Sequence, residues 1–189
     1  MSLQPQEKVA LLKLARAALQ SFLSTGSFFP REIPGSVFRE KRGAFVTLET
    51  EQGHLRGCIG HLEADRPLDQ VVQEMALQAA ISDPRFPAVT SDELPHLKIE
   101  ISVLSPFRQI SDLSEIVVGE HGLLVVEGSR RGLLLPQVAV REGWNAETFL
   151  SHTCRKAGLP ESASQSPDLK IYVFSAEIFS EEGEGILSR

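Results

Sequence analysis

The sequence predicts an α+β fold, with a largely antiparallel sheet and flanking helices. Two segments, residues 6–23 and 68–79, carry apolar side chains at the 3.6-residue spacing of an amphipathic helix. Residues 97–103 instead alternate strictly between apolar and polar side chains, which is typical of a half-buried strand. Short turns separate most of the expected strands, and this favours antiparallel pairing over a βαβ repeat.

The expected helices have recognisable ends. The first, residues 6–23, stops before Gly26, and the second ends near Pro84, because proline disfavours helical geometry in the residue before it. Asn145 is placed to cap a third helix, which ends at Gly158, the residue type preferred for a left-handed cap. We therefore expect three helices separated by groups of strands.

The strands follow from β-branched and aromatic runs bounded by turn residues. Residues 43–50 and 54–59 are expected to form a hairpin over Gly53. The remaining strands are expected at residues 97–103, 115–118, 122–127, 132–135 and 169–178. The acidic end from Glu181 is expected to fray, as chain ends commonly do.

Length and charge restrict the class of protein. With 189 residues and 42% hydrophobic content, the chain is long enough to bury one sizeable core. Its net charge of −6 argues against non-specific nucleic-acid binding and against binding to an anionic membrane surface. No apolar run approaches the ~20 residues needed to span a bilayer, and the start has no signal-peptide core. We expect a cytoplasmic protein.

Several chemical motifs are missing from the sequence. It contains no phosphate-binding loop, no H-E-x-x-H zinc pair and no G-x-S-x-G nucleophile elbow. The five histidines are scattered, so the sequence does not support a histidine-based metal site, although distant residues could still converge. No cofactor and no metal ligand is assigned from the sequence. The two cysteines, Cys58 and Cys154, lie far apart and form no C-x-x-C pair.

The most informative segment is Arg56-Gly57-Cys58-Ile59-Gly60. Glycines around Cys58 allow another backbone or a ligand to approach closely, at a cost to strand stability. Arg56 lies two residues from Cys58 and shares its face if the strand is regular, where its guanidinium would favour the thiolate. The alternative is a small buried cysteine beside a bulge, with Arg56 turned to solvent.

For each of the other candidate residues, a structural role is an alternative to a functional one. The turn at residues 83–87 either stops a helix with Phe86 in the core, or presents Arg85 to a site. His121 lies on a turn, and this position is more typical of a surface histidine than of a site residue. Cys154 shares an apolar helix face with Leu150, which favours core packing.

These segments resemble the signature of the AMMECR domain family. The matching stretches are Phe45-Val46-Thr47-Leu48, the Arg56–Gly60 core, Asp83-Pro84-Arg85-Phe86, residues 100–106, His121-Gly122, residues 134–139, Trp144 and Lys156-Ala157-Gly158. The resemblance spans nearly the whole chain in order. It is carried most specifically by the Arg-Gly-Cys-Ile-Gly core.

The resemblance implies a curled, largely antiparallel sheet and two unequal lobes with a cleft between them. Residues 1–189 would form a single domain, with the small lobe within about 97–140. The chain would be similar to the "A" component of a system that pairs it with a Memo-like protein and a radical SAM protein. That pairing implies a role in some modification pathway, without indicating which component binds what.

Three functions follow as hypotheses. In the first, the chain is an accessory component whose cleft binds a small molecule, a peptide or a partner segment. In the second, Cys58 is a catalytic nucleophile or redox thiol. The binding residues expected in either case are Arg56, Gly57, Gly60, Arg85, Glu100 and His121. In the third, RNA binds a basic face formed by Arg130, Arg131, Arg141, Arg155 and Lys156.

Overall fold

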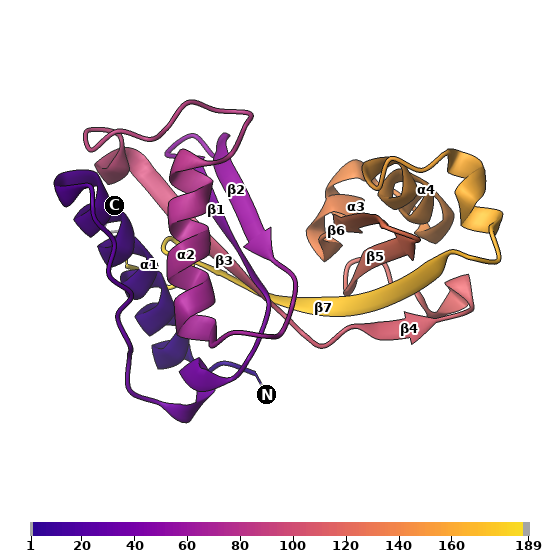
Figure 1. Cartoon of the computed structure of the whole chain (residues 1–189), viewed down its shortest axis with the longest axis horizontal. Helices are drawn as coiled ribbons and strands as arrows, with labels where there is room; N and C mark the ends of the chain where they lie inside the picture. The colour runs from indigo at the N-terminus through magenta and orange to yellow at the C-terminus, as the bar shows by residue number, and fades with distance from the viewer. Residues whose placement is uncertain (1, 187–189) are drawn as a thin grey trace. The chain divides into compact units, whose positions relative to one another are not determined.

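A computed structural model describes residues 2–186 of the chain (Figure 1). The chain divides into two compact units. Unit 1 contains the residues up to Leu104 and those from Glu177 onward, and unit 2 is Ser105–Ala176. Both units combine antiparallel strands with helices, which confirms the predicted α+β class.

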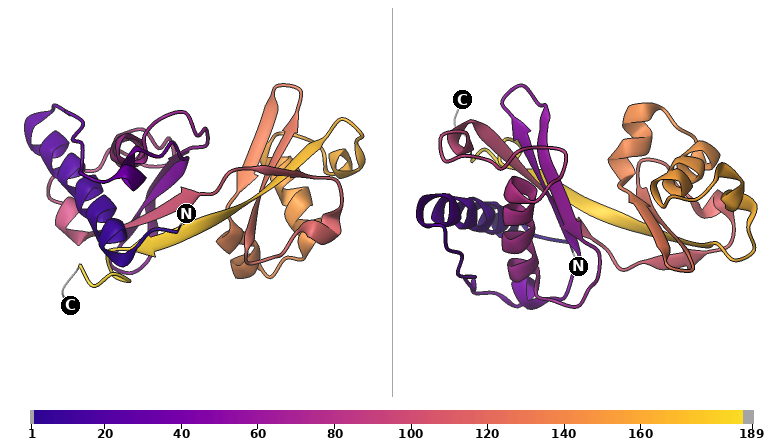
Figure 2. Two further views of the ribbon diagram at one scale, coloured as in Figure 1. Left: turned by 90° about the horizontal axis from the view of Figure 1, so that it is seen from below. Right: turned by 45° about the horizontal axis from the view of Figure 1, so that its top comes forward.

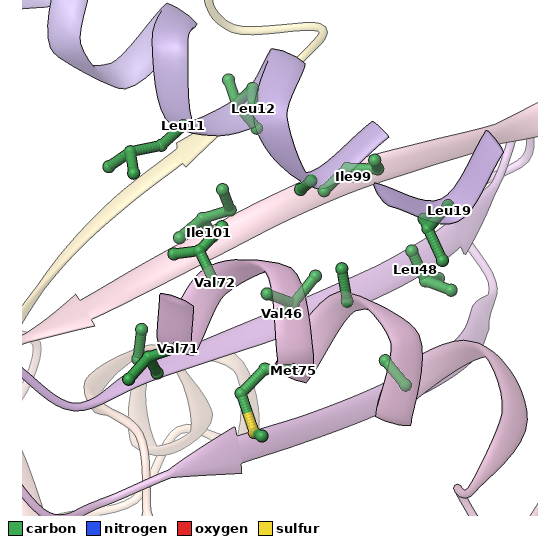
Figure 3. Packing of buried hydrophobic residues seen from close by; sticks show 14 of the residues in the cluster. Leu11, Leu12, Leu19, Val46, Leu48, Val71, Val72, Met75, Ile99 and Ile101 are labelled. Carbon is green, nitrogen blue, oxygen red and sulfur yellow. The ribbon is translucent and has the colours of Figure 1, made fainter. Parts of the chain in front are cut away.

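Unit 1 is built on three central strands, β1 (Ala44–Thr50), β2 (Leu55–His61) and β3 (Leu97–Leu104). β1 lies between β2 and β3 and pairs antiparallel with both. Helices α1 (Pro5–Thr25) and α2 (Leu68–Ile81) cover one face of these strands (Figures 1 and 3). Two short 3₁₀ turns, Ser36–Arg39 and Leu94–His96, complete the unit's local structure.

The core of unit 1 follows from the two sequence periodicities. Even-numbered residues of β1 point toward the helices, because successive strand side chains alternate between faces. The helices bring their apolar stripes to the same layer (Figure 3). The buried residues at its centre are Leu11, Leu12, Leu19, Val46, Leu48, Val71, Val72, Met75, Ile99 and Ile101. We call the opposite face of the three strands the distal face.

Unit 2 has its own antiparallel strands. β5 (His121–Glu127) pairs with β6 (Arg130–Leu134) and with β7 (Lys170–Ser180), and β4 (Arg108–Ile110) pairs with β7. Helices α3 (Pro136–Glu142) and α4 (Ala146–Lys156) lie against these strands, and Figure 2 shows both helices in orange from two further sides. Short 3₁₀ turns lie at Leu113–Glu115 and Glu161–Gln165.

The helix α4 forms as the sequence predicts. Asn145 accepts a hydrogen bond from the Thr148 N–H at 2.9 Å, and Phe149 and Cys154 are fully buried. Burial raises the pKa of the Cys154 thiol, with a smaller contribution from the charge of Glu127. Cys154 is therefore a core residue, as predicted.

One local prediction in unit 2 is wrong, and two elements of the unit were not predicted. Residues 115–118 form no strand, because local bonds close them into turns: the Ile116 N–H donates to Leu113 and the His121 N–H to Val117. The helix α3 was not predicted, because its short apolar run reads equally well as a strand end. The strand β4 was missed as well, since three residues are too few to show a period.

The expected small lobe and frayed tail also differ from the structure. β3 pairs with β1 and belongs to unit 1, while α4 and most of β7 complete the core of unit 2, so that unit extends to Ala176. Glu181 is fully buried, and Ile186 packs against the unit 1 core. Residues 187–189 lie outside the described residues.

Candidate functional site

Cys58 lies at the middle of β2 and is half-buried. Its direct cross-strand partner is Thr47, whose hydroxyl donates a hydrogen bond to the Cys58 Sγ at 3.3 Å. β2 is the edge strand of unit 1, so a backbone group of Cys58 that points away from β1 meets no further strand. The Cys58 N–H donates to Asp83 Oδ2 at 2.9 Å.

The Asp83–Arg85 pair covers the strand edge at Cys58. Arg85 Nε and Nη2 donate to the two carboxylate oxygens of Asp83 at 2.9 and 2.6 Å, and Nη2 also reaches the Cys58 carbonyl oxygen at 3.4 Å. The Asp83 carboxylate thus accepts from the outward N–H of Cys58, and the Arg85 guanidinium donates to the outward carbonyl oxygen of the same residue. Exposed strand edges invite pairing with other chains, and this ion pair closes the edge at one residue.

Asp83 is held in its charged form. The Arg85 side chain is the main cause that lowers the pKa of this carboxyl well below its usual range, with further help from the Cys58 and Arg85 N–H groups. The Asp83 side chain is only 2% exposed, whereas that of Arg85 is 54% exposed. The hydrogen bond from the Cys58 N–H to Asp83 is therefore better shielded from solvent than the ion pair between Asp83 and Arg85.

Asp83→Asn is expected to lower the free energy of unfolding at pH 7 by roughly 1–2 kcal/mol, the range for a charge-assisted hydrogen bond with one exposed partner. Because the folded pKa is depressed, the contribution of Asp83 is complete above the ordinary Asp value of about 3.9 and is lost as the pH falls. Urea denaturation between about pH 2 and 7 measures both effects. The exposed Asp92→Asn is the control, and an acid dependence shared by wild type and Asp83→Asn contradicts the assignment.

Arg56 binds the segment that follows Asp83. Its Nε and Nη2 donate to the two carboxylate oxygens of Glu93 at 2.9 and 3.1 Å, and its Nη1 donates to the Pro87 carbonyl oxygen at 2.9 Å. The bond from Arg56 is the main cause that lowers the pKa of Glu93. The guanidinium groups of Arg56 and Arg85 lie 6.0 and 5.5 Å from the Phe86 ring centroid. Arg56 thus fixes residues 87–93 against β2.

Both glycines of the motif make room for a close neighbour. A Cβ on Gly57 would lie 2.1 Å from the carbonyl oxygen of Ala79 on α2. A Cβ on Gly60 would lie 2.2 Å from the ring of Phe45, its direct cross-strand partner. The predicted close approach is therefore real, but at Gly57 the neighbour is the backbone of α2 and at Gly60 it is an aromatic ring.

Glu100 shares the distal face with Cys58. It lies on β3 directly opposite Thr47, so that Cys58, Thr47 and Glu100 form a polar row across three strands. With strands about 4.8 Å apart, Cys58 and Glu100 are separated by roughly 10 Å, with Thr47 between them. Burial raises the pKa of Glu100, and the charge of Glu49 raises it further. A carboxyl whose pKa is perturbed by burial is a candidate for a functional site.

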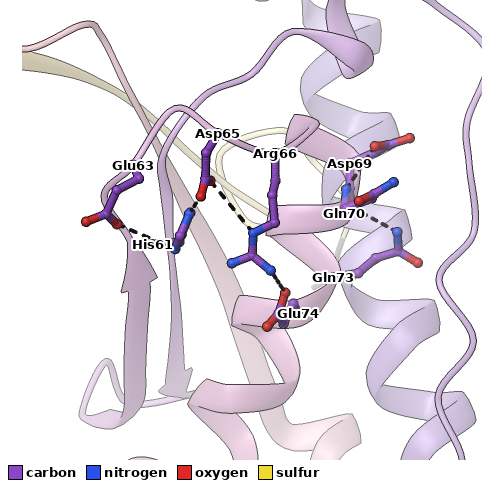
Figure 4. Close-up of polar contacts among 8 residues, drawn as sticks. All are labelled: His61, Glu63, Asp65, Arg66, Asp69, Gln70, Gln73 and Glu74. Carbon is purple, nitrogen blue, oxygen red and sulfur yellow. Dashed lines mark hydrogen bonds and ion pairs between the residues drawn. The ribbon is translucent and has the colours of Figure 1, made fainter.

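His61 follows the motif and takes part in an ion-pair network (Figure 4). Its Nε2 lies 2.6 Å from Asp65 Oδ1, and its Nδ1 lies 3.7 Å from Glu63. Arg66 pairs with Asp65 and with Glu74 of α2. The His61 bond is the main cause that lowers the pKa of Asp65. The network connects the end of β2 to the middle of α2.

His121 belongs to unit 2. Its Nδ1 accepts a hydrogen bond from the Val117 N–H at 3.1 Å and so closes the turn before β5. The next residue, Gly122, is the direct partner of Phe174, and a Cβ there would lie 2.3 Å from that ring. The predicted binding role of His121 stays a prediction.

The basic residues considered for RNA binding all lie in unit 2. They are Arg130 and Arg131 on β6, Arg141 on α3, and Arg155 and Lys156 on α4. Arg130 donates to the Gly158 carbonyl oxygen at 3.1 Å, and Arg141 pairs with Glu142 at 3.0 Å. The Gly158 carbonyl oxygen and the Glu142 carboxylate therefore hold Arg130 and Arg141 within unit 2.

Sequence reasoning missed Thr47 and Glu93. Thr47 looked like an ordinary strand residue, and only the register shows that its hydroxyl meets the sulfur of Cys58. Glu93 had no sequence signal at all, because its partner Arg56 lies 37 positions away. Asp83 was noticed as part of a helix stop and of the family signature, but it was not selected as a site residue, although the hydrogen bond to Cys58 depends on it.

Fold and site together define an α+β protein of two antiparallel units, with a half-buried cysteine on an edge strand. The family model described as AMMECR1 matches residues 12–179. The chain belongs to the AMMECR1 family. Among residues 2–186, no helix is both long and apolar enough to cross a membrane.

Similar proteins come from archaea. The chain is 45% identical to a protein of Methanothermobacter thermautotrophicus, with 96% of this chain and 97% of that one covered. It is 42% identical to Protein MJ0810 of Methanocaldococcus jannaschii, with 93% and 90% covered. The crystal structure of uncharacterized protein PH0010 from Pyrococcus horikoshii matches with a TM-score of 0.87 and 42% identity, over 93% of this chain and 92% of that one.

Proposed function

We propose that this protein is a binding component of a modification pathway, acting beside a Memo-like protein and a radical SAM protein. The distal face of unit 1 around Cys58 is the proposed binding surface for a partner segment or a small ligand. The partner classes come from the family resemblance. The choice of binding over catalysis comes from the geometry of the polar row.

The single observation that carries the proposal is the row formed by Cys58, Thr47 and Glu100 on the face turned away from α1 and α2. Glu100 is partly removed from water, which costs free energy for a charged carboxyl group. A sheet face that only contacts solvent gains nothing from such a group. Thr47 separates Glu100 from the sulfur, so the carboxyl is poorly placed as a general base for Cys58. Binding is the use that this arrangement supports best.

Alkylation of Cys58 tests the proposal directly. In the free protein, iodoacetamide is expected to modify half-buried Cys58 and to spare fully buried Cys154. Addition of the cognate Memo-like or radical SAM protein is expected to slow modification of Cys58 at least about tenfold, because a bound partner covers the thiol. Mass spectrometry of the cysteine peptides measures both rates.

Variants distinguish binding from a structural effect. Glu100→Gln is expected to weaken the partner's protection of Cys58, while Lys13→Ala on the far side of α1 should leave it unchanged. Equal alkylation of Cys58 with and without both partners, in a protein that remains folded, counts against the proposal.

A cysteine-dependent reaction is the second candidate. It is favoured by the Thr47 hydroxyl bond to Sγ and by the proximity of the Arg85 guanidinium to the Cys58 carbonyl. In that case the thiolate would form below the ordinary thiol pKa of about 8.5. The pH dependence of the same alkylation rates separates the two: a midpoint near the ordinary value supports binding, and a lower midpoint supports the reactive thiol.

A further inference from the structure

Glu49 and Glu100 are two half-buried carboxylates on the distal face of unit 1. Their neighbours Leu48 and Ile99 point toward the helices (Figure 3), so the alternation of strand side chains turns both carboxylates to the opposite face. Glu49 lies directly opposite Lys98 and diagonally opposite Glu100, and diagonal neighbours in a sheet lie roughly 7–8 Å apart. Burial is the main cause that raises the pKa of Glu100, and the charge of Glu49 adds to it.

The two carboxylates lack a cation of their own. Neither Glu49 nor Glu100 forms a hydrogen bond or an ion pair with another residue of the described chain. Lys98 is directly opposite Glu49, but its ammonium group binds the Glu182 carboxylate at 2.9 Å. The distal face therefore holds two neighbouring negative charges that are partly removed from water and repel each other, and a cation between them would relieve both costs.

Apolar side chains flank the two carboxylates on the same face. Leu55 is the direct partner of Glu49 on β2 and is 40% exposed. Phe45 lies on β1 and is half-buried, with its ring over Gly60. Phe45 and Glu49 are separated by roughly 13 Å of strand, a length that four or five residues of an extended segment cover. A small amine would contact only the carboxylates, whereas a segment of a protein contacts the carboxylates and the apolar side chains together.

We propose that the partner segment bound by the distal face carries a lysine or arginine side chain, whose charge lies between Glu49 and Glu100. This assignment rests on the proposed function of the face and adds the chemistry of the partner, a basic and partly apolar segment of another protein. An ammonium or guanidinium group placed between the carboxylates replaces one repulsion with two attractions. The net charge of −6 also attracts such a partner from a distance.

Calorimetric titration with three blocked peptides of about ten residues tests the charge preference. The peptides alternate valine with lysine, glutamine or glutamate, so they differ only in the side chains that carry charge. The lysine peptide is expected to bind wild type with a Kd of about 1 mM or below, at least about tenfold more tightly than the glutamine peptide. Lysine and glutamine peptides of equal affinity, or a lysine peptide that does not bind, overturn the proposal.

Two double variants locate the binding. Glu49→Gln with Glu100→Gln is expected to weaken binding of the lysine peptide at least about tenfold. Glu49→Lys with Glu100→Lys should bind the glutamate peptide in place of the lysine peptide, a reversal that a loss of structure does not produce. Glu142→Gln, which removes a carboxylate from unit 2, is the control and should bind as wild type. Lysine-peptide binding that survives both double variants, with folding checked by circular dichroism, reports attraction to another acidic surface and overturns the proposal.

Protection of Cys58 from iodoacetamide separates this assignment from the proposed function. If the cognate Memo-like or radical SAM protein protects Cys58 while the lysine peptide does not bind, the face remains a binding surface and only its preference for a basic segment is overturned. If the cognate proteins do not protect Cys58 either, the proposed function fails with it. Spermidine that binds as tightly as the lysine peptide points to a small amine and overturns the assignment of a protein segment.

Discussion

Gly57→Ala is expected to lower the free energy of unfolding by about 3 kcal/mol, the upper part of the range for overpacking. The new methyl group would lie 2.1 Å from the carbonyl oxygen of Ala79, where no Cβ fits. That oxygen is part of the α2 backbone, so no side-chain rotation relieves the clash, and α2 must move away from β2. Urea denaturation followed by circular dichroism measures the loss.

Gly60→Ala provides a matched comparison on the same strand. Its methyl group would meet the ring of Phe45 at 2.2 Å, and a side chain can be changed where a backbone cannot. Phe45→Leu is therefore expected to restore part of the stability lost in Gly60→Ala, but none of that lost in Gly57→Ala. If Phe45→Leu rescues both variants equally, or Gly57→Ala is as stable as wild type, the account of α2 packing fails.

These two glycines also show what the sequence could and could not reveal. Glycines on either side of Cys58 indicated that something approaches the strand closely, and that is correct at both positions. The identity of the neighbour depends on tertiary packing: α2 is joined to β2 by a six-residue segment, and Phe45 reaches Gly60 only through the hairpin register. Gly122 beneath Phe174 repeats the second arrangement in unit 2.

The elements with strong periods were predictable. α1, α2, the β1–β2 hairpin and β3 all lie close to their expected positions, because each has a buried stripe or alternating pattern of sufficient length. Residues 115–118 were misread because Val117 and Val118 suggest a strand, yet they are 48% and 37% exposed in a turn. Strand propensity describes how a residue fits a half-buried sheet surface, and here no sheet surface is present.

The candidate site was predictable only in part. Cys58 and Glu100 were chosen from separate segments, and the register of β1 with both neighbours places them on one face. Arg56 was expected to act on the thiol, but the structure shows it bound to Glu93 and Pro87. Long side chains reach partners that no local spacing indicates, so an arginine's partner is among the least predictable features of a sequence.

The acidic end of the chain provides the second large effect. Glu181 is fully buried, and both its oxygens accept from the Arg16 guanidinium. Its backbone N–H donates to the Ile99 carbonyl oxygen at 3.0 Å, and its Oε2 accepts from the Ile99 N–H at 2.9 Å. One residue thus ties the chain end to both α1 and β3, which is why residues 181–186 are not frayed.

Glu181→Ala is expected to lower the free energy of unfolding by about 3–5 kcal/mol, because it leaves a mostly buried guanidinium and a buried N–H without their acceptor. The neighbouring Glu182→Gln, whose side chain is 58% exposed, is the control and should change stability by no more than about 0.5 kcal/mol. Denaturation in urea measures both variants.

The double variant Arg16→Met with Glu181→Met separates loss of the pair from exposure of a lone charge. Two apolar side chains of similar length leave no unpaired ion, so we expect the double variant to be more stable than Glu181→Ala alone. The Ile99 N–H still loses its acceptor, so stability should remain below that of wild type. A double variant no more stable than Glu181→Ala would mean that the lone Arg16 charge is not the main cost, and that the bond to Ile99 is what secures the chain end.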